Sequence, residues 1–313
     1  MRAFGILTGM LSLLAASPAL AQTPPHLAEL ETRIIGTANE NPGEYGIAAL
    51  DLATGEVIGV NTDMAFPMAS TMKIAVAAAY LSDVDAGRRS LDDGIAGTTA
   101  LALMDRMMVR SDNHATDLLI ARLGGPASVD SWIDGTGIEG IRVDRTIAQL
   151  LAARRDLWEE EDTSTPRAML QLLQRLDEGS LLSPASRSIL FDMMRRCSTG
   201  KNRIKGLLPV GAVVEHKTGT LNGYSSDVGF MTLPTGQRVA VAFFARGGSN
   251  RPAVIATAAR AIYDGFSAPT ADWNARYADG SIATPTEGRV YASATYPAHG
   301  SPTEWQSTPS TDK

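Results

Sequence analysis

The sequence predicts an α/β fold in which a five-stranded antiparallel sheet, flanked by N- and C-terminal helices, carries an inserted and mostly helical domain. Three observations predict it. Apolar residues follow a strand period near both ends of the chain, over residues 45–60 and 212–245. Between these two regions the period is helical. A helical pattern also precedes the first strand and follows the last one, so both ends of the chain contribute to one sheet.

The N-terminal part is expected to form a helix over residues 24–35 and strands over 45–52 and 57–60. The residues between the strands, Ala53-Thr54-Gly55, suit the short turn of a β-hairpin. Residues 66–81 follow as a loop that becomes a helix, and this helix is apolar around most of its circumference. We therefore expect it to run through the interior.

The rest of the chain continues as helices and then as strands. Helices are expected over 100–109, from 114 onward, and over 129–133, 166–176 and 184–195. Three sequential antiparallel strands are expected over 212–217, 227–233 and 239–245, separated by the turn signals Asn222-Gly223 and Thr235-Gly236. A closing helix is expected over 251–266.

The two ends of the chain predict export and a tail. Residues 1–21 combine one positive charge, an apolar run and an Ala-x-Ala end, which is the pattern of a secretory signal peptide. Residues 22–266 are expected to form the folded domain, with its sheet part at about 22–66 and 208–266 and its helical part at about 67–207. Residues 267–313 are rich in Pro, Ser, Thr and Gly without periodicity, which predicts a disordered tail.

Composition restricts the partners. A net charge of −6 and a pI near 5.3 argue against nucleic acid and favour a small molecule or a polymer. After removal of the signal, no segment is long and apolar enough to predict a membrane span. The single cysteine, Cys197, excludes an intramolecular disulfide and suits a secreted protein of the bacterial periplasm. The scattered histidines predict no metal site, and we expect no cofactor and a monomer.

A candidate nucleophile lies at the start of the buried helix. Ser70 and Lys73 are about one turn apart, so they share a face and lie near enough to exchange a proton. Burial favours the neutral amine of Lys73, and the helix N-terminus stabilises negative charge on Ser70. The simpler alternative makes Ser70 a helix cap and Lys73 a snorkelling side chain. Two further motifs decide between these interpretations.

These motifs are Ser111-Asp112-Asn113, in a short loop between helices, and Lys217-Thr218-Gly219, at the end of a strand. With Ser70-x-x-Lys73 they stand in the order found in class A β-lactamases and penicillin-binding proteins, and the chain resembles the class A family from about residue 27 to 266. Residues 162–166 also resemble the segment that follows the omega loop of that family. The resemblance implies a β-lactamase/transpeptidase-like fold.

The resemblance also implies roles for the first two motifs. Ser70 would attack the carbonyl carbon and Lys73 would accept its proton. Ser111 would relay a proton to the leaving nitrogen, and the Asn113 amide would bind the acyl-amide side chain of the substrate. Asp112 is expected to be a structural hydrogen-bonding residue.

The third motif would bind the substrate carboxylate, through the charge of Lys217 and the hydroxyl of Thr218. Gly219 would let the substrate lie against the strand edge. The oxyanion would be bound by the N–H groups of Ser70 and Thr220.

Other polar residues near these motifs are expected to be structural. His114 and His216 are interpreted as packing or hydrogen-bonding residues. Arg246 is interpreted as a solvated arginine at a strand end, with a second charge for the substrate carboxylate as the alternative. Residues 159–161, three glutamates in a row, are interpreted as an exposed acidic turn.

The chain departs from the family in two places. The family's Glu-x-x-Leu-Asn motif, whose glutamate activates the water that hydrolyses the acyl-enzyme, is absent. The corresponding stretch, 144–153, places Ile147 or Gln149 at the glutamate position, depending on the end from which it is counted. The segment between Lys73 and Ser111 is also shorter than in the family, which would open one rim of the site.

Three hypotheses follow. The first is a serine hydrolase of the β-lactamase type that is acylated on Ser70 and activates water through another residue, with Glu159, Glu160 and Lys73 as candidates. The second is a penicillin-binding peptidase that acts on D-Ala-D-Ala peptides. The third is a binder or sensor that is acylated once and stays acylated. The family resemblance favours the first hypothesis, whereas the missing glutamate favours the second. We adopt the first, a serine hydrolase of the β-lactamase type.

Overall fold

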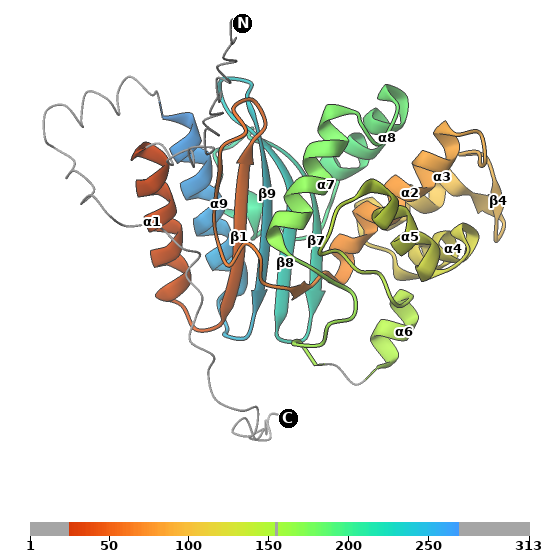
Figure 1. Ribbon diagram of the computed structural model, residues 1–313, viewed down its shortest axis with the longest axis horizontal. Helices are drawn as coiled ribbons and strands as arrows, with labels where there is room; N and C mark the ends of the chain where they lie inside the picture. The colour runs from red at the N-terminus through yellow and green to blue at the C-terminus, as the bar shows by residue number, and fades with distance from the viewer. Residues whose placement is uncertain (1–24, 154–155, 269–313) are drawn as a thin grey trace, which may run out of the picture.

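The computed structural model describes residues 25–153 and 156–268, and the predicted signal peptide and nearly all of the predicted tail lie outside these residues. Its centre is a five-stranded antiparallel sheet in the order β2-β1-β9-β8-β7 (Figure 1). The strands are β1 (Glu44–Asp51), β2 (Val57–Val60), β7 (Val213–Leu221), β8 (Tyr224–Thr232) and β9 (Arg238–Arg246). The N-terminal β1 pairs with the C-terminal β9, from Glu44 opposite Arg246 to Asp51 opposite Val239. The predicted sheet is confirmed.

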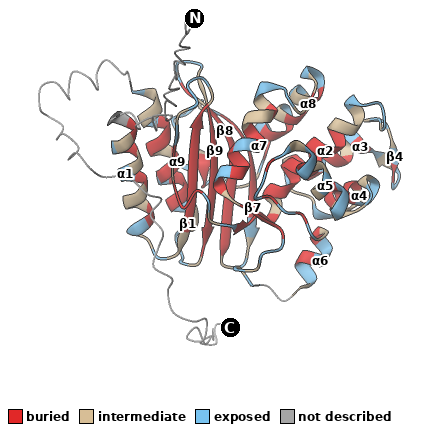
Figure 2. Ribbon diagram, in the orientation of Figure 1, coloured by how far each residue is buried: buried red, intermediate tan, exposed pale blue. Residues whose placement is uncertain are grey.

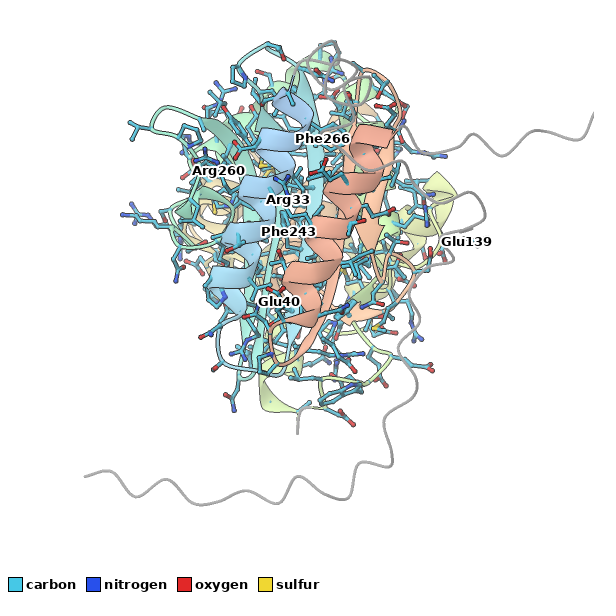
Figure 3. The ribbon with its side chains drawn as sticks, turned by 90° about the vertical axis from the view of Figure 1, so that its left-hand side faces the viewer. Arg33, Glu40, Glu139, Phe243, Arg260 and Phe266 are labelled. Atoms are coloured by element: carbon cyan, nitrogen blue, oxygen red, sulfur yellow. The ribbon has the colours of Figure 1, made fainter. Side chains whose placement is uncertain are left out.

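Two helices cover one face of the sheet. Helix α1 (Pro25–Asn39) and helix α9 (Arg251–Ser267) lie side by side on this face, as Figure 3 shows from outside. Ile34 of α1 and Ile262 of α9 are fully buried with Ile47 and Phe243 of the sheet in one apolar core. The first and last helices, which the sequence predicts beside the sheet, therefore lie on the same face of it.

A second and larger core joins the other face of the sheet to the helical part. Helix α2 (Lys73–Asp85) lies at its centre, and all nine residues from Lys73 to Leu81 are buried, which Figure 2 shows as a continuous buried ribbon. The helices that pack against it are α3 (Ala100–Arg110), α4 (Asn113–Leu123), α5 (Pro126–Thr136) and α8 (Pro184–Arg195), whereas α7 (Pro166–Glu178) packs mainly against β1 and β9. Because α2 consists largely of Ala, Ile, Val and Leu, it can be enclosed on every side.

Short elements connect these layers. Strand β3 (Phe66–Pro67) pairs with β6 (Thr163–Ser164), and β4 (Gly94–Ile95) pairs with β5 (Thr98–Thr99). Two 3₁₀ turns, η1 (Ala69–Met72) and η2 (Ile204–Gly206), precede α2 and β7. A further helix, α6 (Ile147–Ala152), occupies the stretch in which the family carries its glutamate motif.

The structure differs from the sequence-based element bounds mainly at element ends. Strands β7 and β8 extend to Leu221 and from Tyr224, so that Asn222-Gly223 alone closes the hairpin. Helix α9 extends through Ser267, into the first residue of the predicted tail. No helix within the described residues is long and apolar enough to cross a membrane.

We expect Ile74→Ala to lower the free energy of unfolding by about 2–5 kcal/mol, because Ile74 is fully buried in α2 and its truncation leaves a cavity. Urea denaturation followed by circular dichroism measures the change. Leu101→Ala is the matched control: Leu101 is 38% exposed, and its loss should change stability by less than about 0.5 kcal/mol. Equal effects of the two substitutions would contradict the central position of α2.

Candidate active site

Ser70 lies in the η1 turn, which is held from several sides. The Met68 N–H donates to the carbonyl of Asp162 at 2.8 Å, and the Thr71 hydroxyl donates to the carbonyl of Met68 at 2.7 Å. The Tyr224 hydroxyl donates to the carbonyl of Pro67. Ala69 adopts a positive φ of 49°, which is an uncommon conformation for a residue with a Cβ. The turn therefore presents Ser70 from a constrained backbone.

The Lys73 amine is buried one turn after Ser70 and is directed at the loop between α3 and α4. It donates to the Ser111 carbonyl at 2.8 Å, to Asn113 Oδ1 at 2.8 Å and to the Ser111 hydroxyl at 3.2 Å. Among the described residues, no hydrogen bond joins Lys73 to the Ser70 hydroxyl. The structure thus brings the first two motifs together through Ser111 and Asn113.

The Ser111-Asp112-Asn113 loop is shaped by its own helix caps. Ser111 ends α3 in the left-handed conformation, at φ 58°. Asp112 caps α4 by accepting from the Ala115 N–H at 2.9 Å, and it also forms an ion pair with Arg106 at 2.6 Å. Asp112 is therefore a structural residue in this arrangement, as the sequence indicates, and it directs Ser111 and Asn113 toward Lys73.

A second buried amine approaches Ser111 from the sheet. Lys217 of β7 donates to the Ser111 hydroxyl at 3.0 Å and to the Thr218 carbonyl at 2.9 Å. Burial and, to a smaller extent, the positive charge of Lys217 lower the pKa of Lys73 to about 7. Burial also lowers the pKa of Lys217 to about 8. The Ser111 hydroxyl therefore lies between two amines that can change protonation state near neutral pH.

Gly219 has a role that the sequence analysis does not anticipate. A Cβ at this position would lie 2.7 Å from the Met68 carbonyl oxygen and 3.0 Å from the Ala69 Cβ. Strand β7 thus packs directly against the turn that carries Ser70. The neighbouring Thr218 is almost fully buried, and its hydroxyl lies 2.5 Å from the hydroxyl of Thr199.

Arg203 is a buried cation beside the third motif that sequence reasoning missed. Its guanidinium donates to the Gly219 carbonyl at 2.7 Å and to the Thr220 hydroxyl at 2.6 Å. Burial lowers the pKa of Arg203. A single arginine in the loop before β7 has no periodicity or motif to signal this position, because its partners lie on another element.

His216 forms a buried hydrogen-bonded pair with Asp227 behind the same strand. The His216 Nδ1 lies 2.7 Å from Asp227 Oδ1, and Asp227 Oδ2 accepts from the Ile204 N–H at 3.2 Å. The interpretation of His216 as a hydrogen-bonding residue is consistent with this contact. His114, in contrast, is exposed at the start of α4.

The loop that follows Asp144 places no carboxylate at the two positions compared with the family glutamate. Ile147 is 2% exposed and belongs to the larger core, whereas the Gln149 side chain turns back to accept from the Thr146 N–H. Asp117 of α4 holds the start of α6, accepting from the N–H groups of Ile147 at 2.7 Å and Ala148 at 2.9 Å. Position 147 therefore faces the protein interior and position 149 faces away from it.

The acidic run at 159–161 is only partly the exposed turn that the sequence predicts. Glu160 and Glu161 are exposed, but Glu159 is partly buried and forms an ion pair with Arg145 at 2.6 Å. The same arginine binds the buried carboxylate of Asp162 at 2.6 Å. One guanidinium thus ties the two sides of the loop together.

The interpretation of Arg246 as a solvated arginine is wrong. Arg246 is 7% exposed and forms an ion pair with Glu44 at 2.5 Å. Its guanidinium lies over the rings of Phe66 and Trp158 and donates to the Leu157 carbonyl at 3.1 Å. The sequence could not show this because the aromatic partners come from two distant segments.

Comparison with known proteins gives concordant matches. The model of the "Beta-lactamase enzyme family" matches residues 29–266. The beta-lactamase VEB-1 of Pseudomonas aeruginosa is 30% identical over 69% of this chain and 81% of its own length. The carbapenem-hydrolyzing beta-lactamase KPC of Klebsiella oxytoca is 30% identical over 72% and 84%. The crystal structure of a beta-lactamase from Chitinophaga pinensis superposes with a TM-score of 0.72 at 28% identity, covering 76% of this chain and 99% of that one.

We expect Gly219→Ala to slow covalent labelling by a fluorescent penicillin by about 10- to 100-fold, because the added methyl group would displace the Ser70 turn and small misplacements of reacting groups are costly. Stopped-flow labelling measures the rate. Gly36→Ala is the control, since a Cβ there meets no heavy atom within 4 Å. An unchanged labelling rate in Gly219→Ala would show that the contact between β7 and the turn does not position Ser70.

Proposed function

Because this chain belongs to the beta-lactamase enzyme family, we propose that it is a class A-type serine hydrolase that opens the β-lactam amide through an acyl-enzyme on Ser70. One observation carries the assignment of these residues. The side chains of Lys73 and Lys217 converge on the Ser111 hydroxyl beside the turn that carries Ser70. This is the arrangement that acyl transfer to serine requires: a nucleophile, a proton acceptor and a path to the leaving nitrogen.

In the first step the Ser70 oxygen attacks the carbonyl carbon and its proton passes to the neutral Lys73 amine. The tetrahedral intermediate then collapses with cleavage of the carbon–nitrogen bond. Ser111 donates its proton to the leaving nitrogen and takes one back from Lys73, with which it is in contact. The N–H groups of Ser70 and Thr220 would bind the oxyanion.

Substrate orientation is assigned to groups at the edges of the same site. Asn113 is exposed beside Lys73 and would bind the acyl-amide group. The charge of Lys217, with the Thr218 hydroxyl, would hold the carboxylate that β-lactams and D-Ala-D-Ala peptides share. Arg203 adds a second positive charge behind this position. Peptidase activity on D-Ala-D-Ala substrates is therefore the alternative that a substrate test must separate.

One observation favours slow release of the acyl group. The two positions that align with the family glutamate hold the buried Ile147 and the outward-facing Gln149. Hydrolysis of the acyl-enzyme then depends on a base other than a carboxylate held against the ester. We also propose, from the sequence pattern of residues 1–21, that the protein is exported to the periplasm. A monomer remains our expectation for the exported protein.

We expect Ser70→Ala to abolish the covalent adduct with penicillin and the hydrolysis of a chromogenic cephalosporin, because the attacking atom is removed. Intact-protein mass spectrometry and absorbance measure the two losses. Ser90→Ala, in an exposed loop outside the site, should behave as the wild type. A persistent adduct on the Ser70→Ala protein would show that another residue is the nucleophile, and release of D-Ala without cephalosporin hydrolysis would favour the peptidase.

We expect the wild type to show a burst of one product equivalent per site and slow turnover afterwards.

Ile147→Glu in an Asp117→Asn background should accelerate breakdown of the acyl-enzyme by about 100-fold, the size of a general-base effect. The second substitution removes a carboxylate beside the new one, since adjacent carboxylates disfavour each other's ionised form.

Single-turnover mass spectrometry measures the breakdown rate in both backgrounds. Asp117→Asn alone is the first control, and Gln149→Glu is the second because its side chain faces away from the site. Equal acceleration by glutamate at 147 and at 149 would contradict the orientation of α6.

A further inference from the structure

Resting on the proposed function, we infer that the Lys73 amine is also the base that activates the water hydrolysing the acyl-enzyme, in place of a carboxylate. Lys73 would then accept a proton both in acylation, from Ser70, and in deacylation, from water. Two features support this role: carboxylates near the site are engaged by other partners, and the Lys73 nitrogen keeps its hydrogen bonds to Ser111 and Asn113 when it is neutral.

Three carboxylates of the loop and of α4 are held by other partners. Both oxygens of Asp117 accept backbone N–H groups at the start of α6. Both oxygens of Glu159 accept from Arg145, at 2.6 and 3.3 Å. Asp112 is engaged by Arg106 and the Ala115 N–H, and Glu160 has a side chain that is 92% exposed. Within residues 25–153 and 156–268, no carboxylate hydrogen-bonds to Lys73 or Ser70.

The Lys73 amine keeps its position when it is neutral. Its two shorter hydrogen bonds, of 2.8 Å to the Ser111 carbonyl and to Asn113 Oδ1, need two N–H groups. A neutral amine has two, and its lone pair then replaces the third and longest contact, of 3.2 Å to the Ser111 hydroxyl. The lone pair is thus directed toward the Ser111 hydroxyl, through which a proton from water can pass to Lys73.

The charges around Lys73 support a neutral form near neutral pH. Lys217 of β7 disfavours the ammonium, whereas Asp112 and Asp117 of α4 favour it at longer range. The other helices packed against α2 contribute apolar side chains of the larger core, among them Met107, Ile133 and Leu190. Burial is the dominant effect and lowers the Lys73 pKa to about 7.

The proposed step balances its protons. The water oxygen bonds to the carbonyl carbon of the Ser70 ester while one water proton passes to the Lys73 nitrogen. The tetrahedral intermediate collapses, the bond between this carbon and the Ser70 oxygen breaks, and Lys73 returns the proton to that oxygen. The products are the carboxylic acid of the opened substrate, free Ser70 and a neutral Lys73, so no further reactant is required.

The test is the pH dependence of the breakdown of preformed acyl-enzyme, followed by intact-protein mass spectrometry between about pH 5.5 and 8.5. Because only the neutral amine accepts a proton, the rate should rise about tenfold per pH unit below the Lys73 pKa of about 7 and level off above it. A carboxylate base would be ionised throughout this range and would give a constant rate.

Matched variants assign the midpoint of the pH profile. In a Cys197→Ala background, Lys73→Cys alkylated with 2-bromoethylamine replaces the lysine by its thioether analogue, whose amine has a lower pKa, and the midpoint should move to lower pH. Lys201→Cys treated in the same way should leave it unchanged, because Lys201 is exposed outside the site. His114→Gln and Glu159→Gln should retain the pH profile.

The possible results separate the role of Lys73 in deacylation from the formation of the Ser70 acyl-enzyme. A constant breakdown rate across the pH range, a midpoint that the Lys73 analogue does not move, or a loss of breakdown in Glu159→Gln would overturn the role of Lys73 while leaving the Ser70 acyl-enzyme in place. Failure of any acyl-enzyme to form would instead refute the proposed function.

Discussion

The site depends on holding two buried lysine amines within hydrogen-bond distance of one serine hydroxyl. Lys73 comes from the central helix, Lys217 from the edge strand and Ser111 from the loop between α3 and α4. Two like charges in a dry interior repel each other, so each amine needs oxygen acceptors in fixed positions. The carbonyls of Ser111 and Thr218 and the Asn113 amide provide them. The helical part and the sheet must therefore pack in one relative position for the site to exist.

The sequence predicts the parts of this arrangement that depend on local pattern. The strand and helix periods place the sheet, the enclosed α2 helix and the Asn222-Gly223 hairpin, and the three motifs identify Ser70, Lys73, Ser111 and Lys217. Contacts between distant segments are not encoded locally, which is why the partners of Arg246 and Arg203 escape the pattern. The same limit applies to Lys73: helical spacing places it near Ser70, but only the tertiary structure shows that its hydrogen bonds go to Ser111 and Asn113.

The loop that departs from the family motif is nevertheless firmly held. Arg145 bridges Glu159 and Asp162, and Arg246 is enclosed between Phe66 and Trp158. Because the Asp162 carbonyl also accepts from the Met68 N–H, this loop supports the turn that carries Ser70. The loop thus has a structural function that is separable from supplying a base. A chain can lose the glutamate and retain the scaffold for acylation.

The positive φ of Ala69 has a consequence for how this sequence can change. A residue with a Cβ in that conformation costs roughly 1–3 kcal/mol, and glycine would relieve the cost. Glycine would also give the unfolded chain more conformational entropy, and it would make the backbone of the Ser70 turn more flexible. Selection for thermal stability and selection for a fixed nucleophile therefore favour different residues at position 69. Stabilising substitutions selected in laboratory evolution should therefore lie at sites remote from this turn, and Ala69 should keep its strained conformation.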